Sequence, residues 1–99
     1  MKKIINGKKY DTETAKLLAT STRGNGFDYC REELYRKRTG EFFIFGEGGA
    51  YTEYASHPEL NCWGPGEKFI PLTEEKARKW AESYLEVDEY EKIFGIVEE

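Results

Sequence analysis

The segment from Glu33 to Gly46, with the sequence ELYRKRTGEFFIFG, is the stretch that decides the fold. Its two halves, Leu34–Arg38 and Glu41–Phe45, contain the aromatic and branched residues that favour β-strands. Thr39 and Gly40 separate the halves, and glycine is typical of tight turns. The segment therefore predicts a β-hairpin. With a two-residue turn, the facing pairs are Lys37 and Phe42, Arg36 and Phe43, and Tyr35 and Ile44.

The second strand of this hairpin is apolar on both faces, because residues 42–45 are Phe, Phe, Ile and Phe. Such a strand lies at the centre of a sheet that is covered on both sides, or it presents one face to a partner. We therefore expect a central strand, and a homodimer interface along this strand is the alternative.

Upstream of the hairpin, Asn6-Gly7 is the strongest turn signal in the chain, because both residues accept the positive φ angles of a two-residue hairpin turn. Strands of roughly four residues are expected on either side. Thr14 to Arg23 mixes helix-favouring Ala and Leu with strand-favouring Thr and Ser, and we interpret it as a strand with a helix as the alternative. Gly24-Asn25-Gly26 ends this element.

Downstream, residues 47–68 are punctuated by glycine and proline and predict a long loop. Long loops in small domains are often functional, so its aromatic residues Tyr51, Tyr54 and Trp63 are candidate contacts for a partner. The simpler interpretation is a lid that covers the second face of the Phe-rich strand.

A helical arm is predicted after a short strand at Phe69–Leu72. Thr73 is a good N-cap for a first helix. The spacing of its apolar residues predicts a core-facing stripe, formed by Ala77, Trp80, Ala81, Tyr84 and Leu85.

Asp88 predicts the N-cap of a second short helix, with Glu91 as its capping-box partner. Tyr90, Ile93 and Phe94 make the apolar face of this helix. Gly95 is a typical stop, accompanied by a hydrophobic contact from the next residue, Ile96.

These elements predict one α+β domain over residues 1–99, in which a small antiparallel sheet of three to five strands, including two hairpins, packs against C-terminal helices. Its parts are a hairpin-rich sheet at 1–46, the loop at 47–68, and a strand with the acidic arm at 69–99. The chain is 38% hydrophobic and 15% aromatic, so it has enough apolar side chains for a core. No stretch approaches the roughly 20 apolar residues of a membrane span, and the N-terminus turns polar too soon for a signal peptide. We expect a cytoplasmic protein without a membrane contact.

Charge is unevenly distributed along the chain. Residues 1–45 hold ten Lys and Arg against six Asp and Glu, whereas residues 74–99 hold four against nine. The basic run Arg36, Lys37 and Arg38 is a candidate nucleic-acid contact, although the net charge of −4 opposes a polyanion.

The acidic arm is the other candidate surface, since an anionic surface can occupy a basic groove of a partner. Helical pairs of Glu74 with Arg78, Glu75 with Lys79, and Arg78 with Glu82 explain part of its charge. The carboxylates taken as candidate partner contacts are Glu82, Glu86, Asp88, Glu89 and Glu91.

Catalytic and cofactor-binding motifs are missing from the sequence, which has no Walker A, Rossmann, zincin or nucleophile-elbow pattern. His57 is the only histidine, and Cys30 and Cys62 have no metal-ligand spacing with it. The two cysteines are more simply free thiols than a disulfide in a reducing compartment. We therefore expect no enzyme, no metal and no cofactor; a small hydrolase built on unmatched carboxylates is the less favoured alternative.

Several segments, taken together, resemble a family of short accessory proteins from phages and mobile elements of low-GC Gram-positive bacteria. These segments are residues 3–15, 34–37, 40–43, 46–49, 71–73 and 80–82. The resemblance implies anti-CRISPR proteins as relatives, which bind a Cas nuclease or another host defence complex, and it carries over no catalytic residue. We expect a non-enzymatic binding protein of this kind, with a small nucleic-acid-binding regulator as the alternative.

Overall fold

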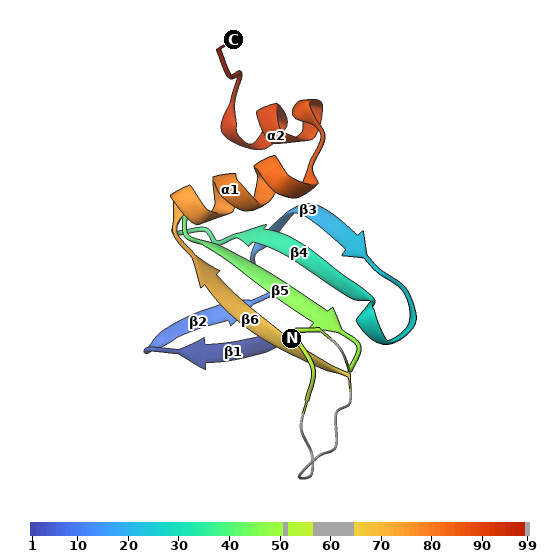
Figure 1. The fold of residues 1–99 in the computed structure, drawn as a ribbon. Helices are drawn as coiled ribbons and strands as arrows, with labels where there is room; N and C mark the ends of the chain where they lie inside the picture. The colour runs from blue at the N-terminus through green and yellow to red at the C-terminus, as the bar shows by residue number, and fades with distance from the viewer. Residues whose placement is uncertain (51, 57–64, 99) are drawn as a thin grey trace.

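The computed structural model describes residues 1–50, 52–56 and 65–98 (Figure 1). Its first element is the predicted hairpin, formed by β1 (Lys2–Ile5) and β2 (Lys8–Asp11), which pair antiparallel. Asn6 and Gly7 both have positive φ angles, 51° and 78°, as a two-residue hairpin turn requires. This hairpin forms a two-stranded sheet of its own.

A four-stranded antiparallel sheet follows, in the order β3-β4-β5-β6. Its strands are β3 (Lys16–Arg23), β4 (Cys30–Arg36), β5 (Phe42–Gly48) and β6 (Gly66–Leu72), with a short 3₁₀ turn η1 (Gly26–Asp28) between the first two. The strand interpretation of residues 14–23 is therefore confirmed, apart from its first two residues. Pairing with β4 overrides the helix preference of Ala and Leu, as tertiary contacts commonly do.

The register of the second hairpin differs from the prediction by one residue. Phe42 faces Arg36, Phe43 faces Tyr35 and Ile44 faces Leu34. The cause is the turn, which has three residues rather than two, because the Lys37 N–H donates to the Glu41 carbonyl at 2.8 Å. Because neighbouring residues of a strand point to opposite faces of the sheet, a one-residue change of register places the side chains of each predicted pair on opposite faces. The predicted facing pairs were therefore wrong.

Strand β5 is central and buried on both faces, as predicted. On one face Phe43 and Phe45 pack with Tyr10 of the first hairpin. On the other face Phe42 and Ile44 pack against the helices. Figure 1 shows α1 lying next to the sheet, with α2 beyond it. The Phe-rich strand is consequently not a homodimer interface, since the first hairpin and the helices cover its aromatic side chains. The predicted lid is confirmed only at the end of the strand, where the buried Tyr54 of the loop packs on Gly46. Residues 51 and 57–64 of the loop lie outside the described residues.

The loop bounds also changed, because β5 continues to Gly48 and β6 begins at Gly66. Residues 47–48 and 66–68 of the predicted loop are thus strand residues.

The arm consists of α1 (Glu74–Tyr84) and α2 (Val87–Phe94). Thr73 caps α1 as predicted, since its hydroxyl accepts the Lys76 N–H at 3.1 Å. The N-cap of α2 is Glu86 rather than Asp88, because Val87 already adopts the helical conformation. Glu91 therefore forms no capping box.

Burial confirms most of the apolar stripe of α1 and corrects its end. Ala77 and Ala81 are completely buried, and Trp80 is partly buried against the sheet. Tyr84, in contrast, is 43% exposed. Gly95 ends α2 as predicted, but Ile96 is 90% exposed and makes no helix-stop contact. Neither helix in the described part of the chain has the length and hydrophobicity that crossing a bilayer requires.

Candidate functional site

A buried carboxylate joins the arm to the sheet. Glu32 lies on the helix-facing side of β4 and is only 4% exposed. Its Oε1 accepts the Trp80 indole N–H at 2.9 Å and an Arg23 guanidinium N–H at 2.7 Å. Its Oε2 accepts the Tyr54 hydroxyl. Donors from β3, α1 and the segment after β5 thus meet on one side chain of β4.

The electrostatics of this cluster are those of a structural ion pair. Burial by itself would raise the pKa of Glu32, but the hydrogen bonds from Tyr54, Trp80 and Arg23 outweigh it, so the pKa is lowered. Burial and the hydrogen bond to Glu32 raise the pKa of Tyr54. Burial also raises the pKa of the Cys30 thiol, which disfavours the reactive thiolate. The cluster therefore stays in one protonation state near neutral pH and holds α1 against the sheet.

Sequence reasoning missed Glu32, although two signals pointed to it. Alternation along β4 places Glu32 on the same face as Cys30 and Leu34, which are buried. A buried Trp also needs a partner for its indole N–H, and Trp80 belongs to the predicted core stripe.

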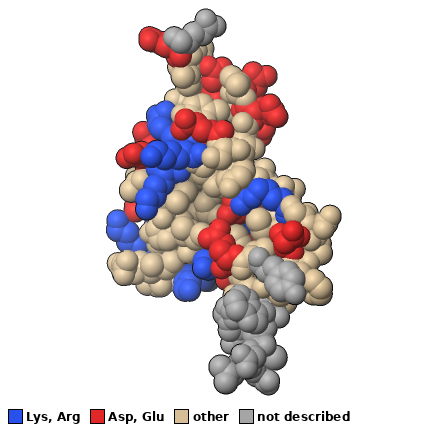
Figure 2. Space-filling view, viewed as in Figure 1, with Lys and Arg blue, Asp and Glu red and all other residues tan. Residues whose placement is uncertain are grey.

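The carboxylates of the arm fall into two groups. Glu82, Glu86, Asp88 and Glu89 are exposed, and none of them forms an ion pair with any residue in the described ranges. Glu91 is partly buried and accepts the Val97 N–H at 2.8 Å, so it serves the fold. Figure 2 shows acidic side chains gathered over α2.

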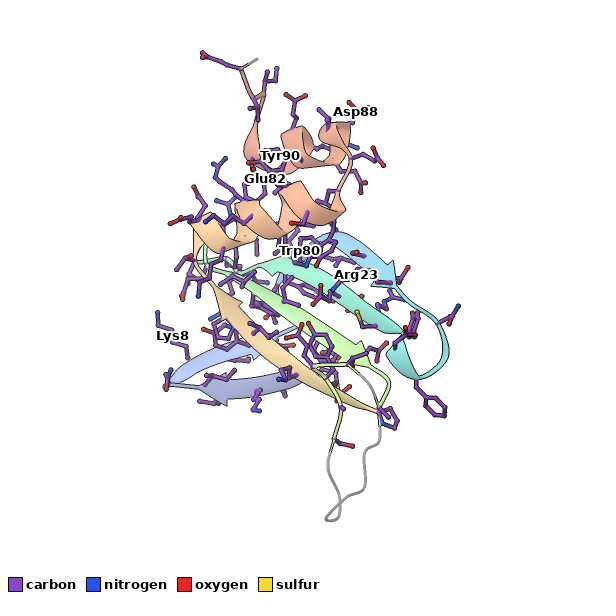
Figure 3. All side chains as sticks on the ribbon, viewed as in Figure 1. Lys8, Arg23, Trp80, Glu82, Asp88 and Tyr90 are labelled. Carbon is purple, nitrogen blue, oxygen red and sulfur yellow. The ribbon has the colours of Figure 1, made fainter. Side chains whose placement is uncertain are left out.

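The first half of the arm is not acidic. Arg78 pairs with Glu74 at 3.2 Å and Lys79 pairs with Glu75 at 3.6 Å, both as predicted. The other predicted pair, Arg78 with Glu82, is not formed. Figure 3 places Trp80 on the side of α1 that faces the sheet, while Asp88 lies on the outer side of α2. The candidate surface is therefore limited to the second half of the arm, from Glu82 onward.

Of the three aromatic residues predicted in the loop, only Tyr54 lies within the described residues, and it is buried. Tyr54 is 2% exposed and donates its hydroxyl to Glu32, so it is a core residue and the prediction of a partner contact was wrong. Tyr51 and Trp63 lie outside the described residues.

The basic hairpin is only partly available to a ligand. Arg36 and Arg38 are exposed. The side chain of Lys37 is 12% exposed, and its Nζ lies 3.6 Å from the centre of the Tyr10 ring. Lys37 therefore packs against the first hairpin. The prediction that it is a free nucleic-acid contact was wrong.

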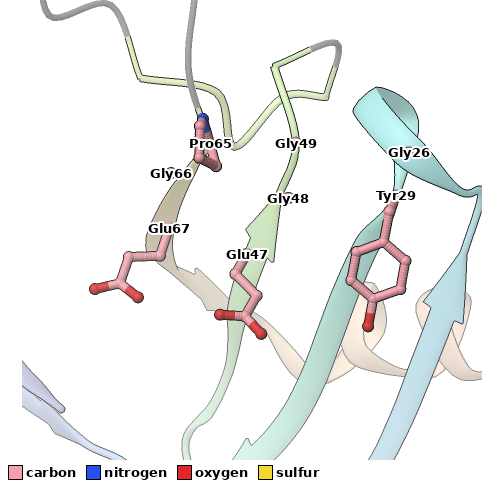
Figure 4. A pocket seen from close by; sticks show the side chains of 8 residues that line it. All are labelled: Gly26, Tyr29, Glu47, Gly48, Gly49, Pro65, Gly66 and Glu67. Atoms are coloured by element: carbon pink, nitrogen blue, oxygen red, sulfur yellow. The ribbon is translucent and has the colours of Figure 1, made fainter.

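A pocket of about 630 Å³ lies at the end of the sheet where β5 ends and β6 begins (Figure 4). Four glycines contribute to its lining, and Glu47 and Glu67 face each other across the two strands. Nowhere in residues 1–50, 52–56 and 65–98 do three or more His, Cys, Asp or Glu residues form a group that suits a metal ion. His57 and Cys62 lie outside those residues.

Comparison with known proteins yields no matching family model, no matching curated protein and no matching solved structure.

Proposed function

We propose that this chain is a non-catalytic binding protein that presents the second half of its arm to a basic surface on a protein partner. The observation that carries the proposal is the set of four exposed carboxylates without ion-pair partners among the described residues. They lie on an arm that the Glu32 hydrogen bonds fix to the sheet, which limits the entropy lost on binding.

Glu86 supports this assignment in a specific way. It occupies the N-cap of α2 without a side-chain capping hydrogen bond, where Ser, Thr, Asp or Asn is strongly preferred. A residue that stabilises its helix poorly is consistent with selection for another role, and a partner contact is such a role.

The class of partner is inferred from the resemblance of the sequence to short accessory proteins of phages and mobile elements. In this proposal the protein belongs to a phage or mobile element, acts in the cytoplasm of the host cell, and inhibits a Cas effector or another host defence complex. Cas9-type effectors hold nucleic acid in a positively charged channel, which suits an acidic ligand. In this proposal the carboxylates of the arm take the place of the negatively charged phosphates that the channel normally binds.

A pull-down against a panel of Cas effectors tests the proposal, with two variants of the four free carboxylates. The first reverses Glu82, Glu86, Asp88 and Glu89 to Lys, and the second neutralises them to Gln or Asn. A matched control reverses four exposed carboxylates outside the arm, Glu13, Glu47, Glu53 and Glu67, to Lys.

We expect the unmodified chain and the control to recover an effector and to inhibit its nuclease activity. The charge-reversed variant should lose binding and the neutralised variant should bind more weakly, while circular dichroism stays unchanged. Recovery of no effector would contradict the proposed partner class. Equal binding by the arm variants and the control would remove the arm from the proposal.

The nucleic-acid alternative retains Arg36 and Arg38 as its exposed cations. A gel shift that weakens with salt and is lost in the Arg36→Ala, Arg38→Ala variant would favour it over the acidic arm.

A further inference from the structure

An apolar groove of about 350 Å³ runs along the acidic half of the arm. Its lining comes from the end of α1, from α2 and from the tail that follows α2. The lining residues are Ala81, Glu82, Leu85, Val87, Tyr90, Glu91 and Val97. Val87 is 70% exposed and Val97 is 55% exposed, so the groove leaves large apolar side chains in contact with water. Exposed apolar patches of this kind commonly mark interaction sites.

Specific contacts hold the walls of the groove in place. The Arg78 guanidinium of α1 lies 4.7 Å from the centre of the Phe94 ring, and Phe94 packs against Tyr90 at 5.1 Å between ring centres. The Glu91 carboxylate holds the tail by accepting the Val97 N–H. The groove is thus built before any partner arrives, which favours affinity.

The charge around the groove identifies the chemistry of its occupant. Residues 82–98 contain six carboxylates and one lysine, and two of the carboxylates, Glu82 and Glu91, belong to the lining itself. A second copy docked arm to arm would bring like charges together, which is unfavourable. The complementary ligand carries apolar side chains flanked by Lys or Arg.

We propose that the groove binds an amphipathic helical segment of the partner, with aliphatic or aromatic anchors in the groove and basic residues on its flanks. The inference rests on the proposed function and extends it, because charge alone does not require the groove. Helix-in-groove recognition suits a site that is lined by side chains of two helices and a tail. Anchors at the centre of such a site usually carry most of the binding energy.

A display selection on the intact chain tests this inference. The library presents helices of about 18 residues, or five turns, with randomised apolar positions at helical spacing and Lys or Arg on the flanks. A second library has Glu on the flanks. We expect enrichment only from the basic library. An enriched peptide is then synthesised, and its affinity and the amide chemical shifts that it changes are measured, together with those of a scrambled peptide of equal composition.

The key variant is Val87→Thr with Val97→Thr, which removes apolar contacts without adding charge and affects two exposed positions. The matched control is Ile4→Thr, at an exposed apolar position of β1. We expect the variant to weaken the peptide by about tenfold or more, the control to leave affinity unchanged, and the shift changes to lie within residues 81–97.

The groove assignment is overturned if the basic library gives no enrichment, if the scrambled peptide binds with equal affinity, or if the Val87 and Val97 changes leave the affinity unchanged. Self-association that is lost in the Val87 and Val97 variant would also overturn it, and a second copy would be the occupant. If the groove variant still binds a Cas effector that the charge-reversed arm loses, the inference fails while the proposed function stands. If the basic peptide binds and no effector is recovered, the partner class fails instead.

Discussion

At the residue scale, Glu32 shows how the fold accommodates a charge in its interior. A buried carboxylate without partners is very unfavourable, and removal of one partner leaves the remaining groups incompletely satisfied. Arg23, Trp80 and Tyr54 all donate to Glu32, so the cost of each substitution depends on the others. This coupling predicts that the cluster behaves as one unit in stability measurements.

Glu32 also predicts a pH dependence of stability. Its pKa is lowered in the folded protein, so its contribution is fully present above the unfolded pKa of about 4.3 and is lost as the pH falls through the lower folded pKa. The Glu32→Gln variant should have a free energy of unfolding about 1 to 3 kcal/mol lower than the unmodified protein at pH 7. It should also lose less stability than the unmodified protein as the pH falls. Urea unfolding at several pH values from 7 to 3 measures both effects, with the exposed Glu13→Gln as control. An unchanged acid slope in Glu32→Gln would contradict the assignment.

Gly46 is required by close packing. A Cβ at this position would lie 2.2 Å from Cζ of the Tyr54 ring, so the ring and its hydrogen bond to Glu32 would have to move. We expect Gly46→Ala to destabilise the protein by about 1 to 3 kcal/mol, although alanine is normally the better strand residue. In a double-mutant cycle by urea unfolding, Tyr54→Ala should abolish most of this cost. Additive effects would show that Tyr54 does not contact Gly46.

At the scale of the elements, the start of α2 separates local sequence signals from the observed structure. The sequence favoured Asp88 as N-cap, whereas the structure has Glu86 in that position without a side-chain hydrogen bond. Asp88 then lies in the first turn, where its negative charge interacts favourably with the helix dipole.

This assignment predicts different results at two neighbouring positions. Glu86→Ser should raise the free energy of unfolding by about 0.5 to 1 kcal/mol, because it supplies the missing cap. Asp88→Ala should cost only about 0.3 to 0.5 kcal/mol, the dipole contribution. Thermal unfolding of both variants measures the difference. A loss of about 1 kcal/mol in Asp88→Ala with no gain in Glu86→Ser would instead support the cap that the sequence suggested.

At the scale of the whole molecule, negative charge is concentrated toward the end that carries α2 (Figure 2). The acidic side chains gather over α2, while Lys8 lies at the turn of the first hairpin (Figures 2 and 3). Such separation accelerates the encounter with a partner of complementary charge.

The association rate with the partner of the arm should therefore fall as salt rises. Between low salt and about 0.5 M we expect a decrease of about tenfold or more, because the Debye length shortens and long-range attraction is screened. Stopped-flow kinetics with the recovered partner measure it. The four-carboxylate Gln and Asn variant should show little salt dependence, and a rate that is independent of salt in the unmodified protein would rule out electrostatic steering.

The sequence by itself predicted the features that local chemistry controls. Asn6-Gly7 adopts its turn because of its own backbone preferences, and Thr73 caps α1 by accepting the N–H of Lys76, three residues later. The apolar run in β5 is stable only where both of its faces are covered. The α+β class follows from these elements.

Only the tertiary structure decided the register of the second hairpin, the burial of Glu32 and Tyr54, and the walls of the arm groove. The burial of Glu32 and Tyr54 depends on contacts between distant segments, such as the hydrogen bond across 48 positions from Trp80 to Glu32. The register depends on the three-residue turn closed by Lys37 and Glu41, and the groove depends on how α1, α2 and the tail pack together. A side chain's burial is set by whatever packs on it, and that neighbour is not encoded in the residues beside it in the chain. The acidic arm of the sequence became a defined apolar groove with a carboxylate rim for this reason.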